Sequence, residues 1–175
     1  MKELVLGGAR SGKSSYAQQR ASESGLQVIY IATATVGDAE MQARIERHQA
    51  ERPLHWQLIE EPLALADTLK EKASAEHCLL VDCLTLWLSN LLGVQDEDVF
   101  QTQVNKLFDV LPSLPGKIIF VSNETGLGII PMGELTRRYC DEAGLLHQRL
   151  AQLCEHVTFM VAGLPQKLKE PLIKP

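Results

Sequence analysis

"LVLGGARSGKSSYAQ", residues 4–18, contains a glycine, four further residues and then Gly-Lys-Ser, which is the spacing of a phosphate-binding loop (P-loop). The apolar residues 4–6 favour a short buried strand, and residues 14–22 favour the first turns of a helix. Strand, loop and helix therefore follow one another in the order that this motif requires. The stretch predicts a P-loop domain of the α/β class that binds a nucleoside triphosphate.

The residue types within the loop suit that chemistry. Gly7, Gly8 and Gly12 allow a tight turn whose backbone N–H groups point at phosphate oxygens. The helix N-terminus adds partial positive charge at the same place. Lys13 can place an ammonium group between the outer phosphates, and the hydroxyl of Ser14 can ligate Mg²⁺. A glycine-rich turn that binds nothing is the alternative, but it does not explain the flanking strand and helix.

Strand and helix patterns alternate along the rest of the chain. β-Branched and apolar runs predict strands over 27–33, 55–60, 77–85, 116–124 and 156–163. Helical periodicity predicts helices over 38–52, from Pro62 onward, and over 84–92, 96–110 and 132–155. Such alternation indicates one domain, residues 1–175, with a mainly parallel sheet that carries helices on both faces. Ligands bind such sheets at the carboxyl ends of the strands.

Composition narrows the class of protein. The chain is 45% hydrophobic and 22% charged, which is ordinary for a soluble globular protein. Its net charge of −5 and the absence of a long basic run argue against a nucleic-acid or membrane-surface partner. There is no signal peptide, no transit peptide and no apolar run of membrane-spanning length, and the four cysteines are widely spaced with apolar flanks. We therefore expect a cytoplasmic protein with reduced thiols.

Asp82 ends the apolar run of residues 79–81. An acidic residue in that position commonly holds Mg²⁺ beside the phosphate loop, directly or through water. The alternative is that Asp82 caps the N-terminus of the helix that starts at Leu84. Because a phosphate loop needs a metal-holding partner, the metal role is the favoured interpretation.

The segment "MQARIERHQAERP", residues 41–53, combines a histidine with two arginines. On a helix, Met41, Ile45 and His48 fall on one side, and Arg44 and Arg52 flank His48 at four-residue spacing. One interpretation is a histidine at the edge of the core beside solvated arginines. The other is a surface facing phosphates, where a neutral imidazole attacks a phosphoryl group and the arginines neutralise the developing charge. The spacing alone does not decide between them.

A set of motifs in one order resembles a known family. These motifs are "GGARSGKS", "YIATA", "RIERHQAERP", "HWQLIEEP", "LLVDCLTLWLSNLL", "VSNETGLGIIP" and "GLPQKLK". Together, over residues 4 to about 169, they are similar to the bifunctional adenosylcobinamide kinase / adenosylcobinamide-phosphate guanylyltransferase of cobalamin biosynthesis. The phosphate loop occurs in many families, whereas "VSNETGLGIIP" and the "RHQAERP" segment followed by "HW" are more particular.

The resemblance implies a RecA-like P-loop fold that assembles as a homotrimer and acts with Mg²⁺. Its substrates would be ATP, GTP, adenosylcobinamide and adenosylcobinamide-phosphate. His48 would be the guanylylated nucleophile, Lys13 the second catalytic residue, and Ser14 and Asp82 the metal-holding residues. The resemblance implies a nucleotide site formed by Gly7, Gly8, Ala9, Arg10, Ser11, Gly12, Lys13, Ser14, Thr33, Ala34, Thr35, Gln49, Ala50, Glu51, Arg52, Glu60 and Asp82.

Asn123 and Glu124, in "VSNETGLGIIP", follow a predicted strand at the edge where ligands bind. They can hydrogen-bond a hydroxyl group or hold a metal-bound water. The alternative is a tight turn that Asn123 stabilises.

Two other functions use parts of the same sequence. A P-loop small-molecule kinase would use the phosphate loop and Asp82 but has no use for His48. A nucleotide-dependent switch module would hydrolyse nucleotide slowly and modify no acceptor. His48 and its arginines, which neither alternative explains, favour the bifunctional enzyme.

Overall fold

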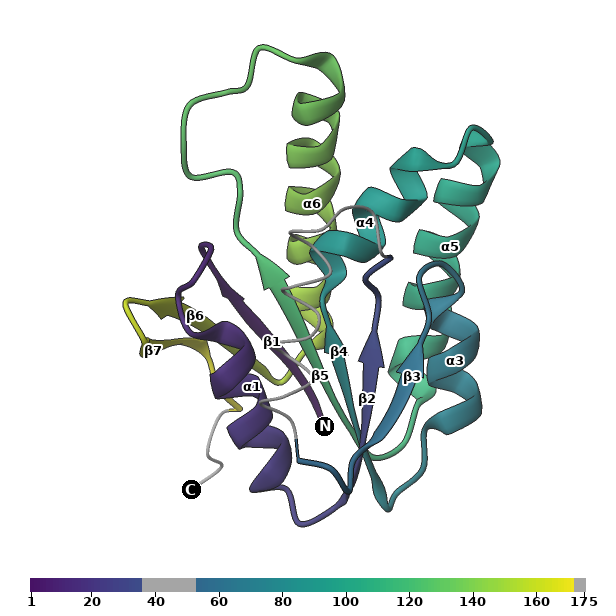
Figure 1. Ribbon diagram of the computed structural model, residues 1–175, viewed down its shortest axis with the longest axis vertical. Helices are drawn as coiled ribbons and strands as arrows, with labels where there is room; N and C mark the ends of the chain where they lie inside the picture. Colours follow the sequence, from purple (N-terminus) through teal and green to yellow (C-terminus); the bar gives the residue numbers. More distant parts are fainter. Residues whose placement is uncertain (36–52, 172–175) are drawn as a thin grey trace.

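The computed structural model describes residues 1–35 and 53–171, and its centre is a sheet of seven strands in the order β3-β2-β4-β5-β1-β6-β7 (Figure 1). Neighbouring strands are parallel except for β6 and β7, which are antiparallel. The expected mainly parallel sheet is confirmed. The strands are β1 (Lys2–Gly7), β2 (Gln27–Ala32), β3 (Gln57–Glu60), β4 (His77–Asp82), β5 (Lys117–Asn123), β6 (His156–Val161) and β7 (Leu164–Lys169).

Helices lie on both faces of the sheet, as the sequence predicts. They are α1 (Lys13–Ser22), α3 (Leu65–Lys72), α4 (Leu84–Gly93), α5 (Glu97–Val110) and α6 (Glu134–Leu153), with a short 3₁₀ turn, η1 (Leu111–Ser113), after α5. Among these, α1 packs on one face, and α3, α4, α5 and α6 pack on the other. The helix expected over 38–52 lies outside the described residues.

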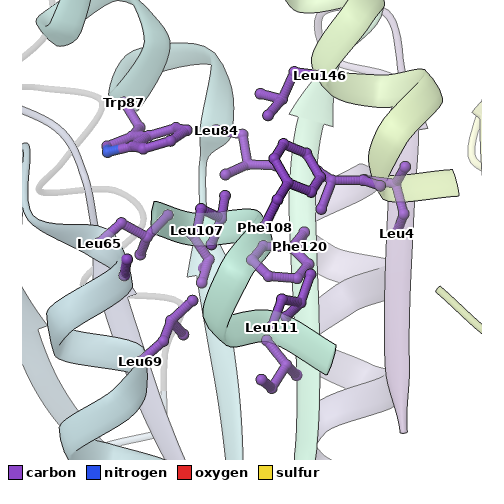
Figure 2. Close-up of a cluster of buried hydrophobic side chains, with 14 of the residues drawn as sticks. Leu4, Leu65, Leu69, Leu84, Trp87, Leu107, Phe108, Leu111, Phe120 and Leu146 are labelled. Carbon is purple, nitrogen blue, oxygen red and sulfur yellow. The ribbon is translucent and has the colours of Figure 1, made fainter. Parts of the chain in front are cut away.

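The alternation of side chains along each strand creates two cores. Leu4, Phe120 and their neighbours pack against the four helices, where Trp87 and Leu107 are completely buried (Figure 2). Val5 and the other residues of opposite phase pack against α1. Strands β4 and β5 are apolar on both faces because both faces are covered, which explains why they read as continuous apolar runs.

The observed strands differ from the predicted ones in two places. The strand expected over 77–85 ends at Asp82, because the chain turns at Cys83 and α4 begins at Leu84. Strand β7 was not expected at all. Its side chains are all exposed, and it contains Pro165, which suits an outer strand but weakens any strand pattern in the sequence.

The described chain contains no helix that is long and apolar enough to cross a membrane. Its cysteines are free thiols, and Cys78 and Cys154 are buried.

A buried charge cluster ties α1 to the sheet. Glu3, on β1, is 1% exposed, and its carboxylate accepts a hydrogen bond from Arg20 Nε of α1 at 3.1 Å. Lys117 Nζ of β5 lies 3.6 Å from the same carboxylate and donates to the carbonyl oxygen of Arg20 at 2.8 Å. The hydrogen bond to Glu3 is the main reason that the pKa of Arg20 is raised. The cluster fixes the position of α1, whose first residues, Lys13 and Ser14, complete the P-loop.

We expect Glu3→Gln to destabilise the fold by about 3 kcal/mol, because it leaves buried Lys117 and half-buried Arg20 without their counter-charge. Urea unfolding followed by circular dichroism measures the change. The matched control is Asp67→Asn, which breaks an exposed pair with Lys106 and should cost no more than about 1 kcal/mol. Equal free energies of unfolding for the two variants would contradict the stabilising role of the cluster.

Candidate active site

The parallel sheet brings the predicted site residues to one edge. Gly7 lies beside Asn123 in the β1–β5 register, and Asp82 lies beside Ala32 in the β2–β4 register. Glu60 ends β3 in register with Ala32. These residues are far apart in the sequence, and the carboxyl ends of five adjacent strands place them along one line.

The P-loop joins β1 to α1 through a backbone that glycine makes possible. Gly7 has φ +152°, and a Cβ on it would lie 2.5 Å from the carbonyl oxygen of Met160 on β6. Gly12 has φ +93° and immediately precedes α1. Ser11 closes the turn by donating its N–H to Gly8 O at 3.3 Å. The loop therefore has the tight turn that the motif predicts.

The β6–β7 hairpin holds the P-loop from outside. Its turn residue Gly163 donates its N–H to the carbonyl oxygen of Ser11 at 3.0 Å. The hydroxyl of Ser11 is buried without a hydrogen-bond partner within the described chain. Sequence reasoning missed this support, because it depends on pairing between residues about 150 positions apart.

Lys13 lies at the first position of α1 with only 7% of its surface exposed. Its Nζ donates to Gly8 O at 2.5 Å, so the ammonium group is folded back over the loop. Burial is the largest influence on the Lys13 pKa and lowers it, while Cys83 and Asp82 raise it. An anionic triphosphate in the loop would raise the pKa further and favour the ammonium form.

Asp82, at the end of β4, is one strand removed from β1, with β5 between them. Its Oδ2 accepts a hydrogen bond from the hydroxyl of Tyr30 at 3.0 Å. The N-cap position of α4 is Cys83, whose side chain makes no capping hydrogen bond, and Asp82 lies one residue before it, so the capping alternative for Asp82 is wrong. The carboxylate is thus oriented by β2 instead of by the helix.

The residues that could hold Mg²⁺ have the right chemistry. Ser14, in the first turn of α1, offers a hydroxyl oxygen, and Asp82 offers a carboxylate oxygen besides the one bonded to Tyr30. Mg²⁺ usually takes one or two protein oxygens together with substrate phosphates and waters. The described residues contain no cluster of three or more His, Cys, Asp or Glu side chains that would bind a metal alone. The donor set therefore fits a metal that arrives with the nucleotide.

Thr33 follows β2 and is completely buried. Its hydroxyl donates to Cys83 O at 2.6 Å and accepts from Cys83 N at 3.0 Å. It therefore fixes the backbone directly after Asp82. Whether Thr33, Ala34 and Thr35 contact a nucleotide stays a prediction.

Asn90 of α4 joins the ends of β2 and β3. Its side-chain amide donates to Thr33 O at 2.8 Å and to Pro62 O at 3.1 Å. Its oxygen accepts from the hydroxyl of Thr35 at 3.3 Å. Glu60 is exposed at the same edge, whereas the next residue, Glu61, uses its carboxylate to accept N–H groups at the start of α3.

The segment with the histidine and arginines lies outside the described residues. This applies to the predicted site residues His48, Gln49, Ala50, Glu51 and Arg52, and to Arg44.

The turn after β5 is organised by Glu124. Its carboxylate Oε1 accepts the N–H of Gly126 at 2.6 Å, so this side chain, and not Asn123, closes the turn. Asn123 donates its own backbone N–H to the hydroxyl of Thr85 at 2.8 Å. His147 of α6 is buried, and its Nδ1 lies 3.8 Å from Oε2 of Glu124. Sequence reasoning missed His147, because a lone histidine within an amphipathic helix carries no motif.

A P-loop after β1, with an acidic residue on β4 and one strand between the two, defines a P-loop nucleotide-binding domain of the RecA-like class. Solved structures agree on the fold. The RadB recombinase matches with a TM-score of 0.51 and 16% identity over 90% of this chain and 73% of that chain. The ATPase EscN of enteropathogenic E. coli matches with a TM-score of 0.57 and 13% identity over 91% of this chain and 41% of that chain.

Sequence comparison gives the family within this class. Residues 3–168 match the family described as cobinamide kinase / cobinamide phosphate guanyltransferase. The bifunctional adenosylcobalamin biosynthesis protein CobP of Pseudomonas aeruginosa is 61% identical over 98% of this chain and 100% of its own length. The corresponding protein CobU of Escherichia coli K12 is 36% identical over 95% of this chain and 98% of its own. The chain belongs to this family, and the resemblance inferred from its motifs is confirmed.

Proposed function

We propose that this cobinamide kinase and cobinamide-phosphate guanylyltransferase carries out both reactions with nucleotide held in the P-loop. The observation that supports this proposal most directly is that Asp82 lies at the same edge of the sheet as Lys13 of the P-loop. Glycines and the β6–β7 turn stabilise the conformation of this loop. In this proposal Ser14 and Asp82 hold Mg²⁺, which would neutralise charge on the phosphate oxygens.

In the kinase reaction, the terminal hydroxyl of adenosylcobinamide attacks the γ-phosphate of ATP or GTP. A bond forms between the hydroxyl oxygen and the γ-phosphorus, and the bond to the β-phosphate oxygen breaks. The electron pair leaves with the nucleoside diphosphate. Lys13 stabilises the charge on the transferring group, and the P-loop N–H groups orient it, so the protein acts chiefly by positioning and electrostatics.

In the guanylyl transfer, neutral His48 attacks the α-phosphorus of GTP, and pyrophosphate leaves with the electron pair of the broken bond. The resulting phosphoramidate is then attacked by a phosphate oxygen of adenosylcobinamide-phosphate, which releases His48 and gives adenosylcobinamide-GDP. A covalent intermediate divides one difficult transfer into two easier ones. The sequence supports this proposal through the arginines that flank His48 at four-residue spacing.

We also propose a homotrimer in the cytoplasm. The loop between β5 and α6 exposes Leu127, Ile129, Ile130 and Met132, each at 79% or more. Exposed apolar side chains gathered on one loop are typical of an interaction surface, and a head-to-tail contact that closes on itself gives a ring. The cytoplasmic location is supported separately by the free cysteine thiols, which suit a reducing compartment. Sedimentation equilibrium should give three times the chain mass of 19.4 kDa, and a single chain mass would contradict the trimer.

The functional test supplies adenosylcobinamide, ATP, GTP and Mg²⁺ to the purified protein and separates the corrinoid products. We expect adenosylcobinamide-phosphate first and adenosylcobinamide-GDP after it, with pyrophosphate released in the second step. A small-molecule kinase would stop at the phosphate. A switch module would form neither product, and either outcome would contradict the bifunctional assignment.

A further inference from the structure

Glu124 is the first residue beyond β5, and it lies directly beside the P-loop. Its backbone N–H donates to the carbonyl oxygen of Gly7 at 3.0 Å, which extends the pairing between β5 and β1 by one residue. Its side chain is 22% exposed, so the carboxylate is partly accessible at this position beside the P-loop. Figure 1 shows that the chain leaves β5 at this edge and passes through an extended loop before it returns as α6.

The Glu124 carboxylate has one hydrogen bond and one close neighbour. Oε1 accepts the N–H of Gly126, and Oε2 lies 3.8 Å from Nδ1 of His147. The other ring nitrogen of His147 lies 2.7 Å from the hydroxyl of Ser122, which is 1% exposed. Ser122 and Glu124 project to the same side because they are two residues apart and the pairing with β1 continues through Glu124. His147 of α6 therefore contacts Ser122 of β5 and lies next to Glu124, the residue that follows the strand.

The protonation state of His147 follows from this arrangement. Burial lowers its pKa, and the opposing effect of Glu124 is smaller, so the imidazole is neutral near neutral pH. When the Ser122 hydroxyl donates to Nε2, the remaining ring proton lies on Nδ1, which faces Glu124. At 3.8 Å this N–H is too far from Oε2 for a direct hydrogen bond. A neutral His147 therefore positions the carboxylate through packing and the N–H dipole, without cancelling its negative charge.

We propose that Glu124 accepts the proton of the attacking hydroxyl in the kinase reaction, and that His147 is the residue that positions Glu124. As the hydroxyl oxygen bonds to the γ-phosphorus, its proton passes to the Glu124 carboxylate. The bond between the γ-phosphorus and the β-phosphate oxygen breaks, and its electron pair leaves with the nucleoside diphosphate. This assignment rests on the kinase activity and not on the guanylyl-histidine step.

Glu124 suits this role better than the other carboxylates of the described edge. Asp82 accepts a hydrogen bond from the hydroxyl of Tyr30, and the proposed function already uses it to hold Mg²⁺. Glu60 ends β3, which three strands separate from β1. Guanylyl transfer needs no such proton acceptor, because a neutral imidazole and an already ionised phosphate oxygen are its nucleophiles. The two reactions should therefore respond differently to Glu124.

The first test is Glu124→Gln, with the two reactions assayed separately. We expect the kcat for phosphorylation of adenosylcobinamide to fall about a hundredfold, within the range for a lost general base. Guanylyl transfer to preformed adenosylcobinamide-phosphate should stay within threefold of wild type. A kinase kcat within threefold of wild type would overturn the proposal. An equal loss in both reactions would show a structural role only.

The second test is directed at His147. We expect His147→Leu to lower the kinase kcat about tenfold, as a partial loss of general-base catalysis, with the KM for nucleotide unchanged. His147→Asn, which can offer an amide N–H near the position of Nδ1, should restore most of that loss. The double variant with Glu124→Gln should be no slower than Glu124→Gln alone, because His147 acts through Glu124. Additive losses would overturn the positioning role of His147. The matched control is His156→Leu, on β6.

Discussion

Replacement of Lys13 by alanine is expected to lower kcat by about a hundredfold to a thousandfold in the kinase reaction, the loss that accompanies removal of a preorganised charge-stabilising group. Lys13 carries the ammonium group of the P-loop, and it is 7% exposed, so its interaction with phosphate is weakly screened by water. Guanylyl transfer should fall as well, because it uses the same bound triphosphate. Lys13→Arg should not restore activity, since the larger, planar guanidinium does not fit the space of a compact ammonium group.

Steady-state kinetics of both reactions, with circular dichroism to verify folding, measure this effect. The matched control is Lys106→Ala, which removes an exposed lysine that pairs with Asp67 at 2.7 Å. That variant should retain both activities. A folded Lys13→Ala enzyme with activity within tenfold of wild type would contradict the assignment of the P-loop as the shared nucleotide site.

The parts of the fold that could be predicted are those with strong local patterns. The P-loop was predictable because its glycines are needed for backbone reasons, as the close approach of Gly7 to Met160 shows. Strands β4 and β5 were predictable because burial on both faces requires continuous apolar runs. Strand β7 was not, because an exposed outer strand with Pro165 is held by pairing to β6 and not by its own composition.

Some residues of the candidate site could likewise be placed from the sequence, and others could not. Asp82 could be placed at a strand end from the sequence, and its proximity to the P-loop followed from the parallel sheet. The support by Gly163, Tyr30 and His147 could not be predicted, because each acts through a contact between residues that are distant in the sequence. The function of Thr33 as a link to Cys83 was also hidden, since a buried hydroxyl and a ligand-binding hydroxyl look alike in a sequence.

The second large effect is expected for His48→Asn, which should abolish guanylyl transfer and leave the kinase reaction active. An amide side chain is not nucleophilic, so no phosphoramidate can form. Phosphorylation of adenosylcobinamide needs the P-loop and a proton acceptor but no histidine nucleophile. The matched control is His55→Asn, which removes an exposed histidine just before β3.

The measurement that tests the central claim most directly is labelling with GTP that carries radioactive α-phosphate, in the presence of Mg²⁺. Wild type and His55→Asn should each form a protein adduct that is labile to acid and stable to alkali, as expected for a phosphoramidate. His48→Asn should form none, and GTP labelled at the γ-phosphate should label no variant. If freshly purified wild type binds GTP but forms no adduct, or if His48→Asn is labelled equally, the guanylyl-histidine mechanism is wrong.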